Sequence, residues 1–175
     1  MIELPALRDD GAVNVVVESP RGSSAKFKYD PPTGVFMLSR PLPYGLVYPH
    51  DWGFIPSTRM ADGDPLDAMV LWEGVSYPGV VIPCRLIGVL QVEQNRKSSP
   101  GRERNDRVLA LPVRASHLEW IKGVSDIDPS MRAQLERFFE HAVAFERKDL
   151  RLLGWGDAPQ ADALLKASQK EMPEK

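Results

Sequence analysis

The first two-thirds of the chain carry short runs of β-branched and aromatic residues, separated by turns rich in Gly, Pro, Asp and Ser. Residues 13–18 (VNVVVE) form a compact β-branched run, and residues 25–29 (AKFKY) alternate apolar and polar positions. Such alternation is typical of a half-buried strand. Residues 41–56 are aromatic and rich in Gly and Pro, so we expect them to be irregular. The same criteria predict further strands at residues 35–40, 68–72, 79–92 and 107–111.

The last third of the chain changes to a helical period. Apolar residues recur at intervals of three and four between residues 129 and 147, which predicts an amphipathic helix. Asp128 and Pro129 suit its cap and first turn. A second helix is predicted at residues 157–170, after a Gly-rich break at residues 154–156. The apolar face of the first helix comprises Met131, Leu135, Phe138, Phe139, Ala142 and Phe145.

These elements predict a single domain over residues 1–175. We expect a mainly β fold, with a compact antiparallel β body, closed as a barrel, and two C-terminal helices packed outside it.

The totals of the sequence narrow the range of functions. The formal net charge of −2 gives no strongly basic footprint, so no nucleic-acid partner is expected. No apolar run reaches the ~18 residues that a membrane span needs, and the N-terminus has no signal-peptide pattern. The single cysteine, Cys84, cannot form an internal disulfide, which agrees with a cytoplasmic location.

Three aspartates crowd the turn MADGDPLDAMVL, residues 60–71. Each pair of such charges repels by roughly 4 kcal/mol at about 4 Å and an effective dielectric constant near 20. One interpretation is a solvated acidic turn. The other is a cation site, because Gly63 and Pro65 stiffen the turn and short oxygen ligands suit Mg²⁺. The three residues are Asp62, Asp64 and Asp67.

Upstream residues add the groups that an anion needs. Glu18 ends one predicted strand, Lys26 lies in the next, Arg40 ends a third, and Tyr48 precedes the acidic turn. Mg²⁺ bridges phosphate oxygens, Arg binds them through two parallel hydrogen bonds, and Lys acts as a point charge. Together these residue types indicate a phosphate site.

The sequence DGDPLD resembles the signature D-x-D-P-x-D of family I soluble inorganic pyrophosphatases. YPHDWGFIPST is similar to the family's YPxNYGFIPxT, and further segments follow in the family's order over nearly the whole chain. The resemblance implies an OB-like five-stranded barrel with flanking helices. It also implies a cytoplasmic enzyme that hydrolyses pyrophosphate, assembled as a homo-oligomer, usually a hexamer in bacteria.

The resemblance implies a role for each matched residue. Asp62 and Asp67 would hold the Mg²⁺ that activates water, with Mn²⁺ as a substitute, and Glu18 would hold a further ion through water. Asp64 would take a proton from the attacking water. The residues that would bind pyrophosphate oxygens are Lys26, Arg40 and Tyr48.

The second half of the family's site matches poorly. Counting from Pro112, a metal-binding Asp of the family falls on Asn105 and a phosphate-binding Lys falls on Arg107. Asp106 is one residue off, so it serves as a metal ligand only if a bulge re-aims it, and Glu93 or Glu103 could reach in instead. Other family ligands are replaced by Gln94, Trp52, Ala142 and Val143, with Lys148 and Arg151 near enough to compensate.

Two hypotheses therefore stand. The first is a divergent Mg²⁺-dependent pyrophosphatase. The second is a catalytically impaired relative that binds a phosphate ligand or a partner, because losing ligands from a metal site weakens both metal binding and transition-state stabilisation.

Overall fold

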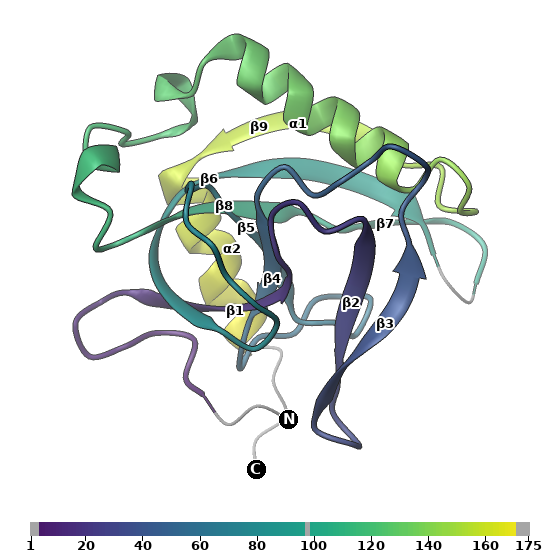
Figure 1. The fold of residues 1–175 in the computed structure, drawn as a ribbon, viewed down its shortest axis with the longest axis horizontal. Coiled ribbons are helices and arrows are strands. Elements are labelled where there is room, and N and C mark those ends of the chain that lie inside the picture. Colours follow the sequence, from purple (N-terminus) through teal and green to yellow (C-terminus); the bar gives the residue numbers. More distant parts are fainter. Residues whose placement is uncertain (1–3, 97–98, 171–175) are drawn as a thin grey trace.

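A computed structural model describes residues 4–96 and 99–170 and shows a closed ring of strands flanked by two helices (Figure 1). Residues 97–98, within the polar and basic segment 95–105 (NRKSSPGRERN), lie outside the described part. The strands are β1 Val13–Ser19, β2 Ala25–Asp30, β3 Val35–Pro41, β4 Asp51–Ile55, β5 Leu66–Val70, β6 Val81–Asn95, β7 Arg102–Arg104, β8 Arg107–Pro112 and β9 Arg151–Asp157. The helices are α1 Pro129–Ala142 and α2 Ala158–Lys170, with 3₁₀ turns η1 Ser116–Leu118 and η2 Val124–Asp126.

Five strands close the barrel in the order β1-β4-β5-β8-β6, and β6 pairs with β1 to complete the ring. The predicted OB-like five-stranded barrel is therefore confirmed. It is not wholly antiparallel, as the sequence had suggested, because β5 and β8 run parallel. Strand β8 pairs with β6 in the antiparallel direction along one edge. Along its other edge β8 pairs with β5, which runs in the same direction as β8.

Strand β6 is long enough to serve several partners. It spans 15 residues and pairs with β1, β7, β8 and β9. Its register to β8 shifts between Leu86 and Gly88, a bulge that bends the strand around the barrel. At Gly88 an added Cβ would lie 2.0 Å from Val124 Cγ2 and 2.7 Å from the Gly156 carbonyl oxygen, so the packing of η2 and β9 against this strand requires glycine.

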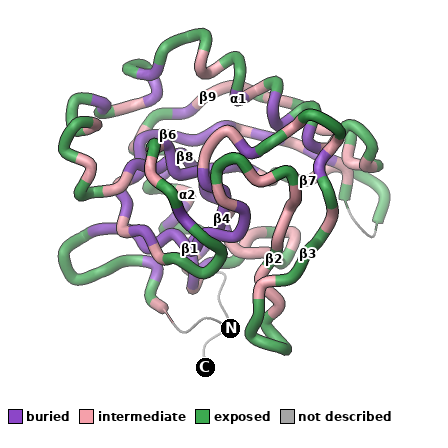
Figure 2. The backbone as a smooth tube through the Cα atoms, in the orientation of Figure 1, coloured by how far each residue is buried: buried purple, intermediate pink, exposed green. Residues whose placement is uncertain are grey.

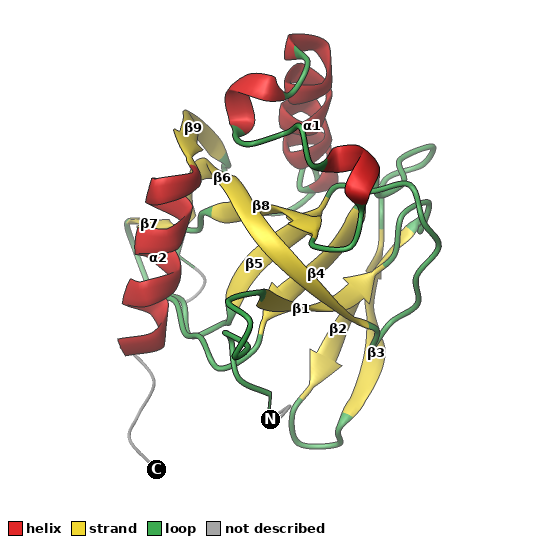
Figure 3. Ribbon diagram, turned by 90° about the vertical axis from the view of Figure 1, so that its left-hand side faces the viewer, coloured by secondary structure: helices red, strands yellow, loops and turns green. Residues whose placement is uncertain are grey.

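Alternation along the strands divides the core into two clusters. On β5, Ala68 and Val70 pack in a cluster with Ala161 and Leu165 of α2. Met69, between them, faces the other way, into a cluster with α1. Figure 2 shows the buried strands at the centre of the molecule, and Figure 3 shows the two helices on different sides of the barrel. The period of two thus gives each helix its own apolar surface.

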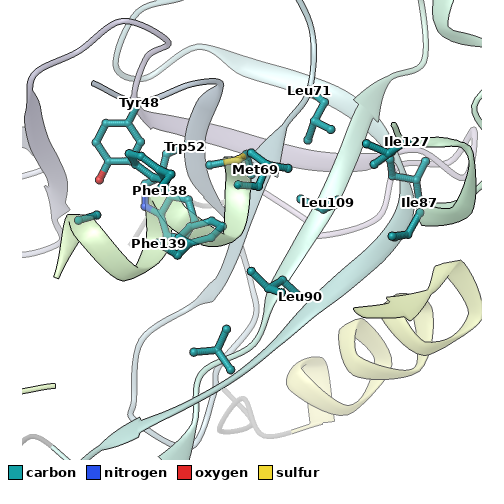
Figure 4. Close-up of a cluster of buried hydrophobic side chains, with 14 of the residues drawn as sticks. Tyr48, Trp52, Met69, Leu71, Ile87, Leu90, Leu109, Ile127, Phe138 and Phe139 are labelled. Carbon is teal, nitrogen blue, oxygen red and sulfur yellow. The ribbon is translucent and has the colours of Figure 1, made fainter. Parts of the chain in front are cut away.

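The cluster against α1 is rich in aromatic rings. Tyr48 lies 5.1 Å from Phe138, and Trp52 lies 5.6 Å from Phe139, between ring centroids (Figure 4). Such tilted and edge-on pairs add to the stabilisation from apolar burial. The C-terminal end of α1 is therefore fixed over the part of the barrel that carries residues 48–52.

Helix α1 begins as predicted but ends early. The Asp128 carboxylate accepts a hydrogen bond from Ser130 N at 2.7 Å, and Pro129 occupies the first turn. The helix ends at Ala142 rather than near residue 147, and Phe145, predicted on its apolar face, is 88% exposed. The helical spacing of Phe145 was therefore coincidental.

Three strands escaped the sequence prediction. β4 lies in residues 41–56, which were expected to be irregular, and β7 lies in the basic segment 95–105, where no strand was predicted. β9 occupies the break predicted between the helices, where it pairs with β6. For β4 and β9, pairing with a strand distant in the sequence overrides a local sequence rich in glycine, whereas β7 pairs with the nearby end of β6.

The hairpin of β2 and β3 forms a separate two-stranded sheet beside the ring (Figure 1). Its register places Lys26 opposite Arg40. Within the described residues, neither helix is long and apolar enough to cross a membrane.

Candidate active site

A cleft of about 960 Å³ lies where the acidic turn, the β2–β3 hairpin and the C-terminal end of α1 meet. Six acidic and six basic side chains line it. The acidic residues are Glu18, Asp30, Asp62, Asp64, Asp67 and Glu146. The basic residues are Lys26, Lys28, Arg40, Arg59, Arg107 and Lys148. Of the nine site residues predicted from the sequence, all but Asp106 line this cleft.

Local hydrogen bonds shape the acidic turn between β4 and β5. Asp64 N donates to Asp62 Oδ1 at 3.1 Å, and Met60 N donates to the Asp64 carbonyl at 2.8 Å. Gly63 adopts φ +84°, a left-handed conformation that other residues rarely take. Thr58 Oγ1 accepts from Leu66 N at 2.9 Å and so fastens the turn to the start of β5. These hydrogen bonds and the start of β5 together hold the three carboxylates at the cleft.

Asp67 lies at the base of the turn, beside the basic residues. Burial raises the pKa of its carboxyl, whereas the charges of Lys26 and Arg107 lower it. The charges of Asp62 and Asp64 raise the same pKa. An ionised Asp67 thus depends on nearby positive charge, which an added cation would supply.

Arg107 stands next to Asp67 because β5 and β8 pair in register at these two residues. Its guanidinium lies 4.9 Å from the centroid of Phe139 and 5.9 Å from that of Trp52, within the range of cation–π contact. Nη1 donates to the Asn105 carbonyl at 2.9 Å. Two departures from the family pattern, Trp52 and Arg107, therefore contact each other, and the indole gives the guanidinium a planar surface.

Glu18 and Lys26 face Asp67 from β1 and β2. Burial raises the pKa of Glu18 to about 7, against the lowering effect of the hydrogen bond that it accepts from Tyr29 N at 2.8 Å. Burial lowers the pKa of Lys26, and the charge of Asp67 raises it. Burial also raises the pKa of Tyr48, so its hydroxyl stays protonated and able to donate. Burial thus disfavours the charged forms of Glu18 and Lys26, and the charge of each depends on its neighbours in a poorly solvated place.

Arg40 is held from the end of α1. Its Nη2 donates to the Ala142 carbonyl at 2.8 Å and forms a close ion pair with Glu146. Glu146 also pairs with Lys148 at 3.2 Å. Lys148 thus brings a positive charge to the part of the cleft lined by Ala142 and Val143, whereas Arg151 does not line the cleft. Glu146 could not be identified from the sequence, because its partner Arg40 lies more than a hundred positions away.

The structure does not bring Asp106 into the cleft. Its neighbours Asn105 and Arg107 line the cleft, and Asp106 lies between them, so alternation turns it away. Its carboxylate accepts from Val92 N at 2.8 Å and forms a two-point ion pair with Arg104. No bulge re-aims it, and the metal role that the sequence suggested for Asp106 receives no support.

Glu93, Gln94 and Glu103 also fail to line the cleft. Glu93 forms a close ion pair with Arg102, which also pairs with Asp149 at 2.6 Å. Gln94 is fully buried, and neither polar atom of its amide has a hydrogen-bond partner among the described residues. At the position where the family pattern has a metal-binding Asp, the residue that lines this cleft is therefore Asn105, whose side chain is neutral.

Carboxylates beside Lys and Arg in one cleft are side chains that suit divalent cations and phosphate oxygens, respectively. The chain matches the family model described as inorganic pyrophosphatase over residues 15–173. It belongs to the inorganic pyrophosphatase family.

Individual relatives agree with this assignment. An inorganic pyrophosphatase of Nostoc sp. is 34% identical over 167 residues, which cover 95% of each chain. One of Thermus thermophilus is 36% identical over 152 residues, 85% of this chain and 83% of the relative. A crystal structure of inorganic pyrophosphatase from Thermus thermophilus superposes with a TM-score of 0.87 at 34% identity, covering 95% of each chain. Sequence and fold therefore indicate the same family.

Proposed function

We propose that the protein is an inorganic diphosphatase that hydrolyses pyrophosphate to two phosphates in this cleft. The observation that carries the proposal is that the acidic turn and the predicted basic residues line a single cleft in a chain of this family. Relatives at 34–36% identity over most of the chain carry the name inorganic pyrophosphatase. The alternative, a binding protein without turnover, has no comparable support.

We propose Mg²⁺ as the cofactor, with Mn²⁺ as a substitute, held by Asp62, Asp67 and Glu18. These residues suit Mg²⁺ because their carboxylates supply oxygen ligands. A cation would also stabilise the charged form of Asp67, which burial disfavours. Among the described residues no three carboxylate, His or Cys side chains form a ready-made ligand set. Mg²⁺ usually keeps several of its waters and is bound through one or two carboxylates. When bound, Mg²⁺ lowers the pKa of a water ligand and neutralises phosphate oxygens.

The chain's own residues then divide the remaining work. Asp64 accepts a proton from the attacking water, whose oxygen forms a bond to one phosphorus as the bridging P–O bond breaks. The freed oxygen of the leaving phosphate takes a proton from solvent water, and two phosphates result. The groups that bind phosphate oxygens are Lys26, Arg40, Tyr48 and Arg107, each of which lines the cleft.

The test is the release of phosphate from pyrophosphate, with and without metal. We expect hydrolysis in Mg²⁺, a loss of at least about 100-fold after chelation, and recovery with Mn²⁺. Equal rates with and without chelator would reject metal dependence. A rate in Mg²⁺ no better than that of an Asp64→Asn variant would favour the binding-only alternative.

Arg107 offers a second measurement. We expect Arg107→Lys to raise the KM for pyrophosphate about tenfold, because Lys loses the two-point grip on phosphate and the stacking on Trp52 and Phe139. Steady-state kinetics would show the change. The matched control is Arg114→Lys, at an exposed position outside the cleft. An unchanged KM would contradict the role proposed for Arg107.

We further propose that the protein works in the cytoplasm as a homo-oligomer, with a hexamer expected from the family resemblance. Large exposed side chains, including Tyr44, Trp120 and Phe145, provide apolar surface for contacts between copies. Light scattering of the purified protein would give the mass of the assembly, and a monomer would contradict the proposal.

A further inference from the structure

A lysine of the chain contacts the acidic turn directly. Lys28 Nζ lies 3.0 Å from Asp64 Oδ1, and both side chains stay partly exposed to the cleft. Lys28 comes from β2, a strand of the hairpin, and Asp64 from the turn after β4. The contact therefore joins two separate walls of the cleft. A positive charge from β2 thus lies beside a carboxylate of the acidic turn.

The influence of Lys28 extends beyond Asp64. Its positive charge lowers the pKa of Glu18, one of the residues proposed to hold a metal. The six acidic and six basic side chains of the cleft balance in formal charge. The acidic turn is thus already offset by positive groups of the chain itself, and the Lys28 ammonium lies within ion-pair distance of the Asp64 carboxylate.

We infer that Lys28 is a built-in cation that competes with the divalent metal at the Asp64 end of the cleft. This inference rests on the proposed function and deepens it. A divalent ion held by Asp62 and Asp67 meets the repulsion of the Lys28 ammonium, which lies at the neighbouring carboxylate of Asp64. Lys28 therefore weakens metal binding in the absence of pyrophosphate and raises the metal concentration that the enzyme needs.

The experiment measures Mn²⁺ binding to the full chain without pyrophosphate, by electron paramagnetic resonance of the free ion. We expect Lys28→Met, which keeps the length of the side chain but removes its charge, to bind Mn²⁺ about fivefold more tightly. Lys28→Arg keeps the charge and is expected to match the wild type within about twofold. Lys166→Met, exposed on α2 and outside the cleft, is the control for a general change in charge.

The outcomes separate this inference from the proposed function. Equal or weaker Mn²⁺ binding by Lys28→Met, alongside clear binding by the wild type, overturns the role of Lys28 and leaves the proposed enzyme intact. An equal gain in Lys166→Met would mean that only overall charge matters, which also overturns it. If no variant takes up Mn²⁺, both the proposed metal site and this inference fail.

Discussion

Asp64→Asn is expected to lower the kcat for pyrophosphate hydrolysis by at least about 100-fold, because a positioned general base typically contributes two to four orders of magnitude. Asparagine keeps the size of the side chain but cannot take a proton from water. The backbone of the turn is expected to remain in place, since Asp64 contributes its amide N–H and its carbonyl to the hydrogen bonds of the turn. The measurement is phosphate release in saturating Mg²⁺.

The matched control for this prediction is Asp162→Asn on α2, an exposed carboxylate that does not line the cleft. It removes the same charge from the chain and is expected to keep the wild-type kcat. If Asp64→Asn kept more than about a tenth of the wild-type kcat, Asp64 could not be the main proton acceptor, and water or another carboxylate would have to fill that role.

Gly53→Ala is expected to lower the free energy of unfolding by about 3 kcal/mol or more, the largest effect on stability that we foresee. Gly53 pairs with Val17 across β1 and β4, and a Cβ there would lie 1.9 Å from the Val16 carbonyl oxygen. The obstacle is backbone, not a flexible side chain, so relief requires two barrel strands to separate. Denaturant unfolding followed by tryptophan fluorescence would give the value.

Gly34→Ala is the control for Gly53→Ala, because it shows how much stability is lost when a glycine is replaced without a steric clash. Gly34 has φ +72° at the tip of the β2–β3 hairpin, and a Cβ there would meet no atom within 4 Å. We expect this variant to lose only about 1 kcal/mol, from backbone conformation. Equal losses for the two variants would show that the barrel absorbs the added methyl group at Gly53.

The elements that could be predicted from the sequence are those whose own side chains carry a clear period. The β-branched run of β1 and the alternation of β2 mark strands, and α1 carries both a helical period and the cap pair Asp128 and Pro129. β4 and β9 had no such mark, because glycine and tryptophan interrupt their pattern. Their strands form because β1, β5 and β6 offer open edges to pair with.

The candidate site likewise has features that could be predicted from the local sequence and features that only the tertiary structure shows. Asp62, Asp64 and Asp67 lie within six positions, so their closeness and the stiffness of their turn are local properties that can be read from the chain. The contact of Lys28 with Asp64, the pairing of Glu146 with Arg40, and the turning away of Asp106 depend on how separate segments meet. Local sequence carries no information on such contacts, because they depend on strand register and on the closure of the ring. The sequence alone therefore indicated the chemistry of the cleft, whereas tertiary packing selected which charged groups reach it.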